Sequence, residues 1–223
     1  MNRDLDALHK VYEDLGVHVT RIPSVTTDSV FHRDVVAWTP FGLVQCRMGK
    51  ATRAWEPEVW FKSMALEYFS KPPLGSTFEG ADLLWCGNDH AVIGIGDRTG
   101  DSGAVWLCKL LSDRGVVVRL IVLPEEYPQH LLGLMNCVSG SIVSSRHFPA
   151  SWSASTLPPA EVALKGSNWV EVGRTIIINK GCPTIIKMLE GYGLDVVPVS
   201  IEQLLAHGGG VACATGVYAV KQF

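Results

Sequence analysis

Apolar side chains at helical spacing open the chain. Leu5, Leu8 and Tyr12 recur at three- and four-residue intervals, and Gly16 follows them as a helix stop. The next stretch, residues 17–22, alternates between apolar and polar side chains. The pattern therefore predicts a helix over about the first 15 residues, followed by a strand over 17–22.

A pattern of strand, turn, strand, helix and strand then returns along the chain. Its clearest copies begin near residues 35, 82 and 168, and a weaker copy lies at Met135–Ser144. The predicted strands are Val35–Thr39, Leu43–Arg47, Leu83–Cys86, His90–Ile95, Val116–Leu123, Trp169–Val172, Thr175–Asn179 and Asp195–Val199, and the predicted helices are about Pro57–Phe69, Gly103–Ser112 and Pro183–Tyr192. Such repetition predicts a radial or stacked α/β architecture, with an ordinary mixed α/β sheet as the alternative.

One segment interrupts the repeats. Arg146–Leu164 is rich in serine and proline. We expect a long surface loop there, and a lid over a site is one option.

Composition narrows the class of protein. Hydrophobic residues make up 47% and charged residues 18%, which rules out intrinsic disorder. A net charge of −3 makes nucleic acid a poor candidate partner. No apolar run has membrane-spanning length and the first residues are polar, so we expect a cytoplasmic protein with no membrane partner. The six cysteines form no CxxC pair, so no metal site is expected and most should be buried thiols.

Four clusters of polar or small residues could carry chemistry. They are Thr27–Asp34, Phe78–Asp82, Pro128–Leu131 and Gly208–Thr215. Each also fits a structural role, as a charged turn, a solvated turn, a structural histidine, or a glycine turn before a buried cysteine. Together they supply a thiol, an imidazole and carboxylates, the groups that covalent cysteine catalysis requires. The order argues against a papain-like protease, because there the cysteine precedes the histidine.

The motifs, in this order, resemble the guanidine-modifying pentein superfamily, which includes dimethylarginine dimethylaminohydrolases, arginine deiminases and amidinotransferases. The resemblance runs from about Leu15 to the C-terminus. The stretches that carry it are Asp28–Asp34, Arg47–Gly49 with Arg53 and Glu56, Glu79–Asp82, Gly94–Thr99, His130–Leu131 and Gly209–Cys213. The resemblance implies an α/β propeller built of ββαβ repeats, with residues 1–223 forming a single catalytic domain. The repeats found in the sequence agree with it.

The resemblance also implies catalytic roles. Cys213 would attack the central guanidinium carbon, and His130 would protonate the departing amine and then activate water. Glu79 would orient His130 and stabilise its charge. The product would be citrulline plus an amine, with no cofactor.

Four further residues are implied as substrate-binding. Asp34 would hold the guanidinium nitrogens, and Arg53 and Arg98 would clamp the substrate carboxylate, because an Arg fork binds a carboxylate through two hydrogen bonds. Asp82 would support the loop that carries Glu79 or contact the substrate through it. The implied partner is a small guanidino amino acid.

The chain departs from the family pattern at two places. Arginine deiminases typically follow the catalytic His-Leu with an Asp, whereas Leu132 and Gly133 follow here. This difference favours an N-methylated arginine over arginine. The family's opening strand also has no counterpart before the first helix, which we expect to alter one side of the pocket.

Other functions stay open from the sequence. An amidinotransferase would pass the amidino group to an amine instead of water, although such enzymes are generally longer. A non-catalytic pentein-fold binding protein, or an unrelated α/β protein, would not need the cysteine, histidine and glutamate together. The seven tryptophans leave a homodimer open as well.

Overall fold

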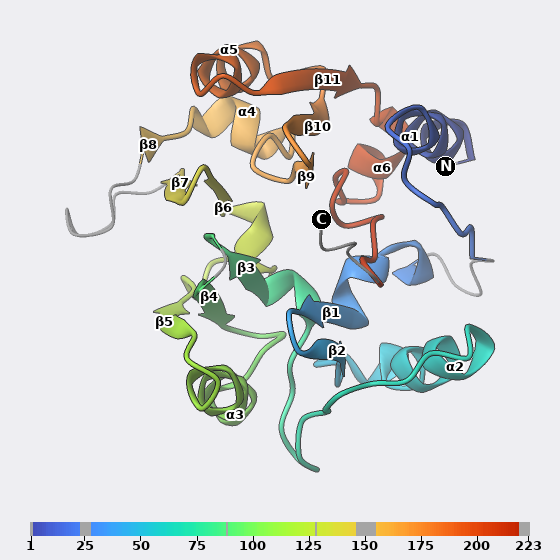
Figure 1. Ribbon diagram of the computed structural model, residues 1–223, viewed down its shortest axis with the longest axis vertical. Helices are drawn as coiled ribbons and strands as arrows, with labels where there is room; N and C mark the ends of the chain where they lie inside the picture. The colour runs from blue at the N-terminus through green and yellow to red at the C-terminus, as the bar shows by residue number, and fades with distance from the viewer. Residues whose placement is uncertain (1, 23–27, 88, 128, 146–154, 219–223) are drawn as a thin grey trace. The chain divides into compact units, whose positions relative to one another are not determined.

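The protein is described by a computed structural model that covers residues 2–22, 28–87, 89–127, 129–145 and 155–218. Contacts divide the chain into two compact units. Unit 1 comprises Met1–Thr27 and Gly133–Thr215, and unit 2 comprises Asp28–Leu132 and Gly216–Phe223. Each unit contains two copies of the repeat that the sequence predicts (Figure 1).

The first copy in unit 2 begins with a β-hairpin. Strands β1 (Val36–Thr39) and β2 (Gly42–Gln45) pair antiparallel, and helix α2 (Glu56–Ser63) follows them. Ser70 then forms a parallel bridge to Val44 in β2, so the third strand is reduced to one bridge. The prediction that this helix reaches Phe69 is wrong, because the chain leaves the helix and Ala65 adopts a left-handed φ of 50°.

The second copy in unit 2 is complete. Strands β3 (Leu83–Trp85) and β4 (His90–Ile95) are antiparallel, and β5 (Val117–Val122) pairs parallel to β4 after helix α3 (Asp101–Ser112). Helix α3 lies against this sheet (Figure 1) because its apolar face is buried there. The fully buried side chains of this core include Phe78, Ile93, Ala104, Leu107 and Leu111.

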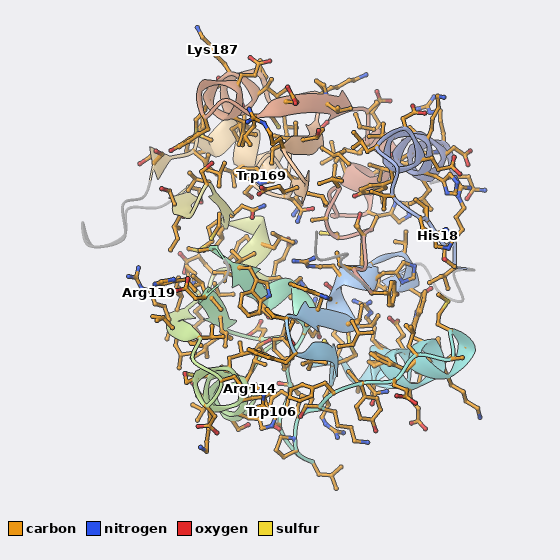
Figure 2. The ribbon with its side chains drawn as sticks, viewed as in Figure 1. His18, Trp106, Arg114, Arg119, Trp169 and Lys187 are labelled. Atoms are coloured by element: carbon orange, nitrogen blue, oxygen red, sulfur yellow. The ribbon has the colours of Figure 1, made fainter. Side chains whose placement is uncertain are left out.

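Unit 1 holds the other two copies. In one, β6 (Met135–Val138) and β7 (Ser141–Ser144) form a hairpin, and β8 (Ser155–Thr156) pairs parallel to β7 before helix α4 (Pro159–Ala163). In the other, β9 (Val170–Val172), β10 (Thr175–Asn179), helix α5 (Pro183–Gly191) and β11 (Asp195–Val199) give the order β9-β10-β11. Trp169, labelled in Figure 2, belongs to the apolar core of this unit, whereas Lys187 points away from α5.

Two helices close unit 1. Helix α1 (Asn2–Asp14) contacts the short helix α6 (Glu202–Ala206). The buried Asp4 carboxylate accepts hydrogen bonds from the backbone N–H groups of Gln203 and Leu204, at 2.6 and 2.9 Å. A carboxylate at this place satisfies N–H groups that the first turn of a helix cannot pair itself.

The repeats predicted near residues 82 and 168 are confirmed in full, and two further local predictions are wrong. Residues 17–22 form no strand in the described part of the chain. In the segment predicted as a loop, Arg146–Leu164, residues 155–156 form β8 and 159–163 form α4, and residues 146–154 lie outside the described residues.

The helices of the described residues are too short or too polar to cross a lipid bilayer.

Candidate active site

Short 3₁₀ helices place the acidic residues of unit 2. Asp34 ends one such turn (His32–Asp34), and Glu79 directly precedes another (Gly80–Asp82). The two turns pack closely because Gly80 lacks a side chain, and a Cβ there would overlap the main-chain oxygen of Arg33. This packing brings the Asp34 and Glu79 carboxylates to the same place.

His130 and Glu79 form a buried ion pair in unit 2. His130 Nε2 lies 2.6 Å from Glu79 Oε2, and Glu79 is fully buried. The other Glu79 oxygen accepts a hydrogen bond of 2.8 Å from the Gly49 backbone N–H. His130 Nδ1 lies 3.7 Å from Asp34 Oδ1. The imidazole therefore sits between two carboxylates, and Glu79 fixes its orientation through Nε2.

The surrounding charges determine the protonation of this pair. Burial alone lowers the pKa of His130, but the carboxylates of Asp34, Asp82 and Glu79 outweigh it and raise the pKa to about 9. Burial works to raise the pKa of Glu79, yet its hydrogen bond and ion pair with His130 hold that pKa below the usual range. At neutral pH the pair is therefore an imidazolium and a carboxylate.

Asp34 has one oxygen engaged and one without a partner. Its Oδ2 accepts a hydrogen bond of 2.6 Å from Arg53 Nη1. Its Oδ1 is buried and has no hydrogen-bond partner. A buried carboxylate oxygen without a donor is costly unless something supplies one. Asp34 Oδ1 is thus a candidate acceptor for a cationic N–H donor beside His130.

Arg53 is surrounded by protein groups. Its Nε and Nη2 donate to the Glu56 carboxylate, its Nη1 to Asp34, and its Nη2 also to the main-chain oxygen of Phe31. Burial lowers the pKa of Arg53, but the hydrogen bonds and charges of Glu56 and Asp34 raise it to a value above the ordinary one. These contacts position Asp34, and the clamp on a substrate carboxylate stays a prediction.

The other predicted clamp residue is more accessible. The Arg98 side chain is 15% exposed, and its Nη1 lies 4.0 Å from Glu79 Oε1. It therefore borders the His130–Glu79 pair from the loop after β4. Its predicted contact with a substrate carboxylate also stays a prediction.

Asp82 is buried and holds two backbone segments. Its Oδ1 accepts a hydrogen bond of 2.8 Å from the Leu131 N–H, and its Oδ2 accepts one of 2.7 Å from Thr99 Oγ1. With only 1% of its surface exposed, Asp82 has the contacts of a supporting residue. Of the two roles predicted for it, these contacts favour support of the loops over contact with a substrate.

Cys213 lies in unit 1, where Asn168 holds its backbone. The Cys213 N–H donates to Asn168 Oδ1 at 3.1 Å, and the Ala212 N–H donates to the Asn168 main-chain oxygen at 3.2 Å. Gly210 leaves room for this amide, because a Cβ there would lie 2.5 Å from Asn168 Oδ1. Cys213 is not part of a disulfide, and the residue is partly exposed.

A lysine lies in the electrostatic surroundings of Cys213. Burial lowers the pKa of Lys165, and the negative charge of the Cys213 thiolate acts to raise it. Lys165 and Asn168 belong to one turn, since the Asn168 N–H donates to the Lys165 main-chain oxygen at 3.0 Å. A cation near a thiol favours the thiolate form.

The sequence singled out neither Asn168 nor Lys165, and it gave Thr99 no role of its own. Thr99 is fully buried and its hydroxyl accepts from the Glu79 N–H while donating to Asp82. Asn168 acts on the backbone of a distant segment. Contacts of this kind leave no local signal in a sequence, although Asn168 follows a predicted loop and precedes a predicted strand.

Among the described residues, the side chains of Asp34, Glu79 and His130 could together hold a cation. Ligand atoms of Asp34, Glu79 and His130 all lie within 4.8 Å of one another. Two of these residues are already joined as an ion pair, and Asp34 Oδ1 has no hydrogen-bond donor. The arrangement can therefore accept N–H donors from a cationic organic group.

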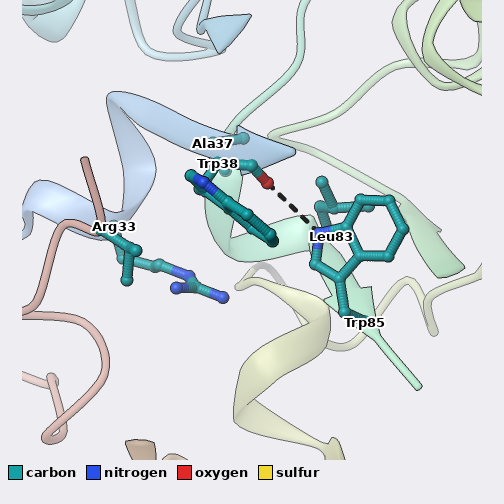
Figure 3. A pocket seen from close by; sticks show the side chains of 7 residues that line it. Arg33, Ala37, Trp38, Leu83 and Trp85 are labelled. Carbon is teal, nitrogen blue, oxygen red and sulfur yellow. Dashed lines mark hydrogen bonds between the residues drawn. The ribbon is translucent and has the colours of Figure 1, made fainter. Parts of the chain in front are cut away.

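A small cavity lies beside these turns in unit 2. It has a volume of about 50 Å³ and is lined by Arg33, Ala37, Trp38, Gly80, Leu83, Trp85 and Val217 (Figure 3). The Trp85 indole N–H donates to the Trp38 main-chain oxygen at 3.2 Å, which closes one side. A cavity of this size holds a water molecule or two but no amino acid.

Comparison with known proteins identifies the fold. No family model matches the sequence, and no curated protein matches it. Among solved structures, DDAH from Pseudomonas aeruginosa, as a cysteine-to-serine mutant complexed with citrulline, superposes with a TM-score of 0.84 at 21% identity, covering 95% of this chain and 86% of that one.

Two other structures agree with it. A dimethylarginine dimethylaminohydrolase adduct with S-methyl-L-thiocitrulline gives a TM-score of 0.83 at 22% identity, covering 95% of this chain and 86% of that one. The N-terminal domain of ArgZ, an arginine dihydrolase from the ornithine–ammonia cycle in cyanobacteria, gives 0.80 at 18%, covering 95% and 84%. The chain therefore has the α/β pentein fold, as the resemblance predicts.

Proposed function

We propose that the protein is a cysteine-dependent hydrolase that cleaves a C–N bond in the guanidino group of arginine or an N-methylated arginine. One observation carries this proposal: the imidazolium of His130 lies between the buried carboxylates of Glu79 and Asp34, and Asp34 Oδ1 has no donor. The similarity to a DDAH complexed with citrulline and to an arginine dihydrolase bound to its substrate supports it.

The carboxylates suit a guanidinium because its charge is spread over planar N–H groups. A guanidinium N–H would donate to Asp34 Oδ1 as a charge-assisted hydrogen bond. Such bonds place the guanidinium carbon and keep its charge next to the acids. The resemblance implies that Arg98 and Arg53 bind the carboxylate at the other end of the substrate; Arg98 is the more accessible of the two, since Arg53 is buried against Glu56 and Asp34.

In the first step, the Cys213 thiolate attacks the guanidinium carbon and a C–S bond forms. His130 Nε2 is held by Glu79, so Nδ1 is the nitrogen left to give a proton. The imidazolium donates that proton to the departing nitrogen while the C–N bond breaks, and the amine leaves. Because its pKa is raised to about 9, His130 is protonated at neutral pH and can act as this acid.

In the second step, neutral His130 accepts a proton from water. The hydroxide adds to the carbon of the covalent adduct, the new hydroxyl gives up its proton to solvent, where the released amine takes it up, the C–S bond breaks as the C=O bond forms, and the Cys213 thiolate returns. Carbon, nitrogen and oxygen then form the ureido group of citrulline. His130 ends protonated again, so one water is consumed and one amine is released per cycle.

Within this class, an N-methylated arginine is the favoured substrate. Leu132 and Gly133 follow His130-Leu131 where arginine deiminases typically place an aspartate. Without that carboxylate, the pocket would offer one charge fewer to unsubstituted nitrogens and more room for methyl groups. This preference rests on the resemblance and on the residues present.

The test incubates the purified protein separately with arginine, monomethylarginine and asymmetric dimethylarginine and follows citrulline by mass spectrometry. We expect citrulline from a methylated arginine, with Cys213→Ser reduced to below about one thousandth of wild-type turnover. Citrulline from arginine alone would keep the reaction and overturn the methyl preference.

Two other outcomes would overturn the hydrolase. Amidino transfer to added glycine or ornithine would identify an amidinotransferase. Full turnover by Cys213→Ser would exclude Cys213 as the nucleophile. No product from any of the three substrates, together with an unreactive Cys213, would favour a binding protein.

A further inference from the structure

Asp82 links the three segments that carry His130, Glu79 and Arg98. Its Oδ1 binds the N–H of Leu131, the residue next to His130. Its Oδ2 binds the hydroxyl of Thr99, the residue next to Arg98, and that same hydroxyl accepts from the Glu79 N–H at 3.0 Å. The Asp82 carboxylate and the Thr99 hydroxyl therefore connect the backbone next to His130 with the backbone of Glu79, its ion-pair partner.

The link is tightly enclosed. Asp82 is 1% exposed and Thr99 is fully buried, so water does not compete for these hydrogen bonds. A Cβ on Gly94 of strand β4 would lie 2.9 Å from Leu131 Cβ and 3.1 Å from Asp82 Oδ1. Leu131 therefore packs directly against strand β4 and the Asp82 carboxylate.

We propose that Asp82 is the positioning residue of this site: through Leu131 and Thr99 it fixes His130 at hydrogen-bond distance from Glu79. The inference deepens the proposed function and rests on it for the catalytic consequence only. It assigns Asp82 no contact with substrate.

Asp82 also contributes charge. The titratable groups whose charges act on it are His130 and Glu79. Burial raises the pKa of Asp82 to about 6, against the opposing effects of His130, Leu131 and Thr99, so the residue is mostly ionised at pH 7. As a carboxylate, Asp82 helps Asp34 and Glu79 to keep His130 protonated.

Two substitutions probe position and charge. Asp82→Asn keeps the shape and removes the charge, and its Nδ2 can only donate to Thr99, where the carboxylate accepts. Thr99→Val keeps the charge and removes the hydroxyl link. Thr99→Ser restores the hydroxyl and serves as the conservative rescue. Asp113→Asn, which changes an exposed carboxylate paired with Lys109, is the matched control for charge.

The first measurement is the NMR titration of His130 and the resonance of its Nε2–H in the free protein. We expect Asp82→Asn to lower the His130 midpoint by about one pH unit from its wild-type value. Thr99→Val should leave that midpoint near wild type and shift the Nε2–H resonance upfield, because the bond to Glu79 lengthens. Thr99→Ser and Asp113→Asn should match wild type in both.

The second measurement is steady-state turnover of the methylated arginine. We expect kcat to fall about 10- to 100-fold in Asp82→Asn and Thr99→Val with little change in KM, since a misplaced acid slows chemistry more than binding. An unchanged His130 titration and resonance in both variants would overturn the positioning role. If wild type turns nothing over, the NMR results still decide this inference, and the proposed function alone fails.

Discussion

At the scale of single residues, the structure makes His32 a second partly buried histidine, with the opposite behaviour to His130. Its ring packs edge-on against Trp60 at 4.2 Å, and its Nδ1 is buried without a partner. Burial, with the nearby Arg53 charge, lowers the pKa of His32 to about 4. The neutral form is therefore the one the fold accommodates.

This shift predicts a loss of stability in acid. An unfolded histidine takes up a proton near pH 6.5 while folded His32 resists until about 4, so the free energy of unfolding decreases as pH falls through that window. The loss attributable to His32 is up to about 3 kcal/mol. His32→Phe should remove most of it, measured by denaturant unfolding between about pH 7 and pH 4.

The control for His32 is another histidine. Asp82 titrates in an overlapping range with the opposite sign, because a raised carboxyl pKa favours the folded state in acid. The comparison of variant with wild type isolates His32, and the exposed His90→Phe should keep the wild-type slope. A slope that is the same in His32→Phe and wild type would contradict the prediction.

The residues of the candidate site divide into those a sequence can predict and those it cannot. Asp34, Glu79, His130 and Cys213 stand in motifs whose residue types already indicate chemistry. The engagement of Arg53 with both Glu56 and Asp34 could not be predicted, because Asp34 lies beside Arg53 only in the folded chain.

At the scale of elements, two glycines in helices are predicted to respond in opposite ways to substitution by alanine. Gly103 lies in the first turn of α3, where a Cβ would overlap the main-chain oxygen of Thr77. Gly191 ends α5, and nothing lies within 4 Å of its Cβ position. Gly191→Ala should raise the free energy of unfolding by about 0.5–1 kcal/mol through helix propensity. Gly103→Ala should lower it by about 1–3 kcal/mol through overpacking.

Denaturant midpoints of the two variants and wild type provide the measurement. The pair controls for helix propensity, since both substitutions gain it. Equal increases in both midpoints would show that the backbone at Thr77 yields to the new methyl group.

Elements with long-range partners were the ones the sequence predicted best. Strands β4, β10 and β11 have the bounds expected from their apolar runs, because each lies in a three-stranded sheet that selects those residues. The alternation over 17–22 led to a wrong prediction because alternation gives no strand without a neighbour to pair with. The two-residue strand β8 is too short to show any period.

A surface contact beyond helix α3 could not be predicted from the sequence either. Arg114, labelled in Figure 2, follows helix α3. Its guanidinium lies over the rings of Phe41 and Phe69, at 5.7 and 4.6 Å from their centroids. A cation on an aromatic face is a local arrangement that requires three separate segments of unit 2. No short stretch of the sequence contains all three of these residues.

At the scale of the whole molecule, the hydrolase proposal requires the Cys213 thiolate and the carboxylates of Asp34 and Glu79 to act on one guanidinium. That requirement can be tested without any turnover, by a reagent that carries both a cation and an electrophile.

The reagent is 2-chloroacetamidine, compared with the neutral 2-chloroacetamide, and mass spectrometry reads the labelling of Cys213. An amidinium offers planar N–H donors to Asp34 and Glu79, and a charged hydrogen bond contributes about 1.5–3 kcal/mol. We therefore expect the cationic reagent to be preferred by about tenfold or more beyond its intrinsic reactivity towards a free thiol, with excess arginine protecting Cys213.

Asp34→Asn and Glu79→Gln should each reduce this preference by about tenfold, while the exposed Asp113→Asn should leave it unchanged. Because Asp34 also pairs with Arg53, thermal unfolding of each variant is needed to separate lost recognition from lost folding. A preference that survives in both folded variants would mean that these carboxylates do not bind the cation that Cys213 attacks, and the proposed mechanism would be wrong even if the protein hydrolyses guanidines.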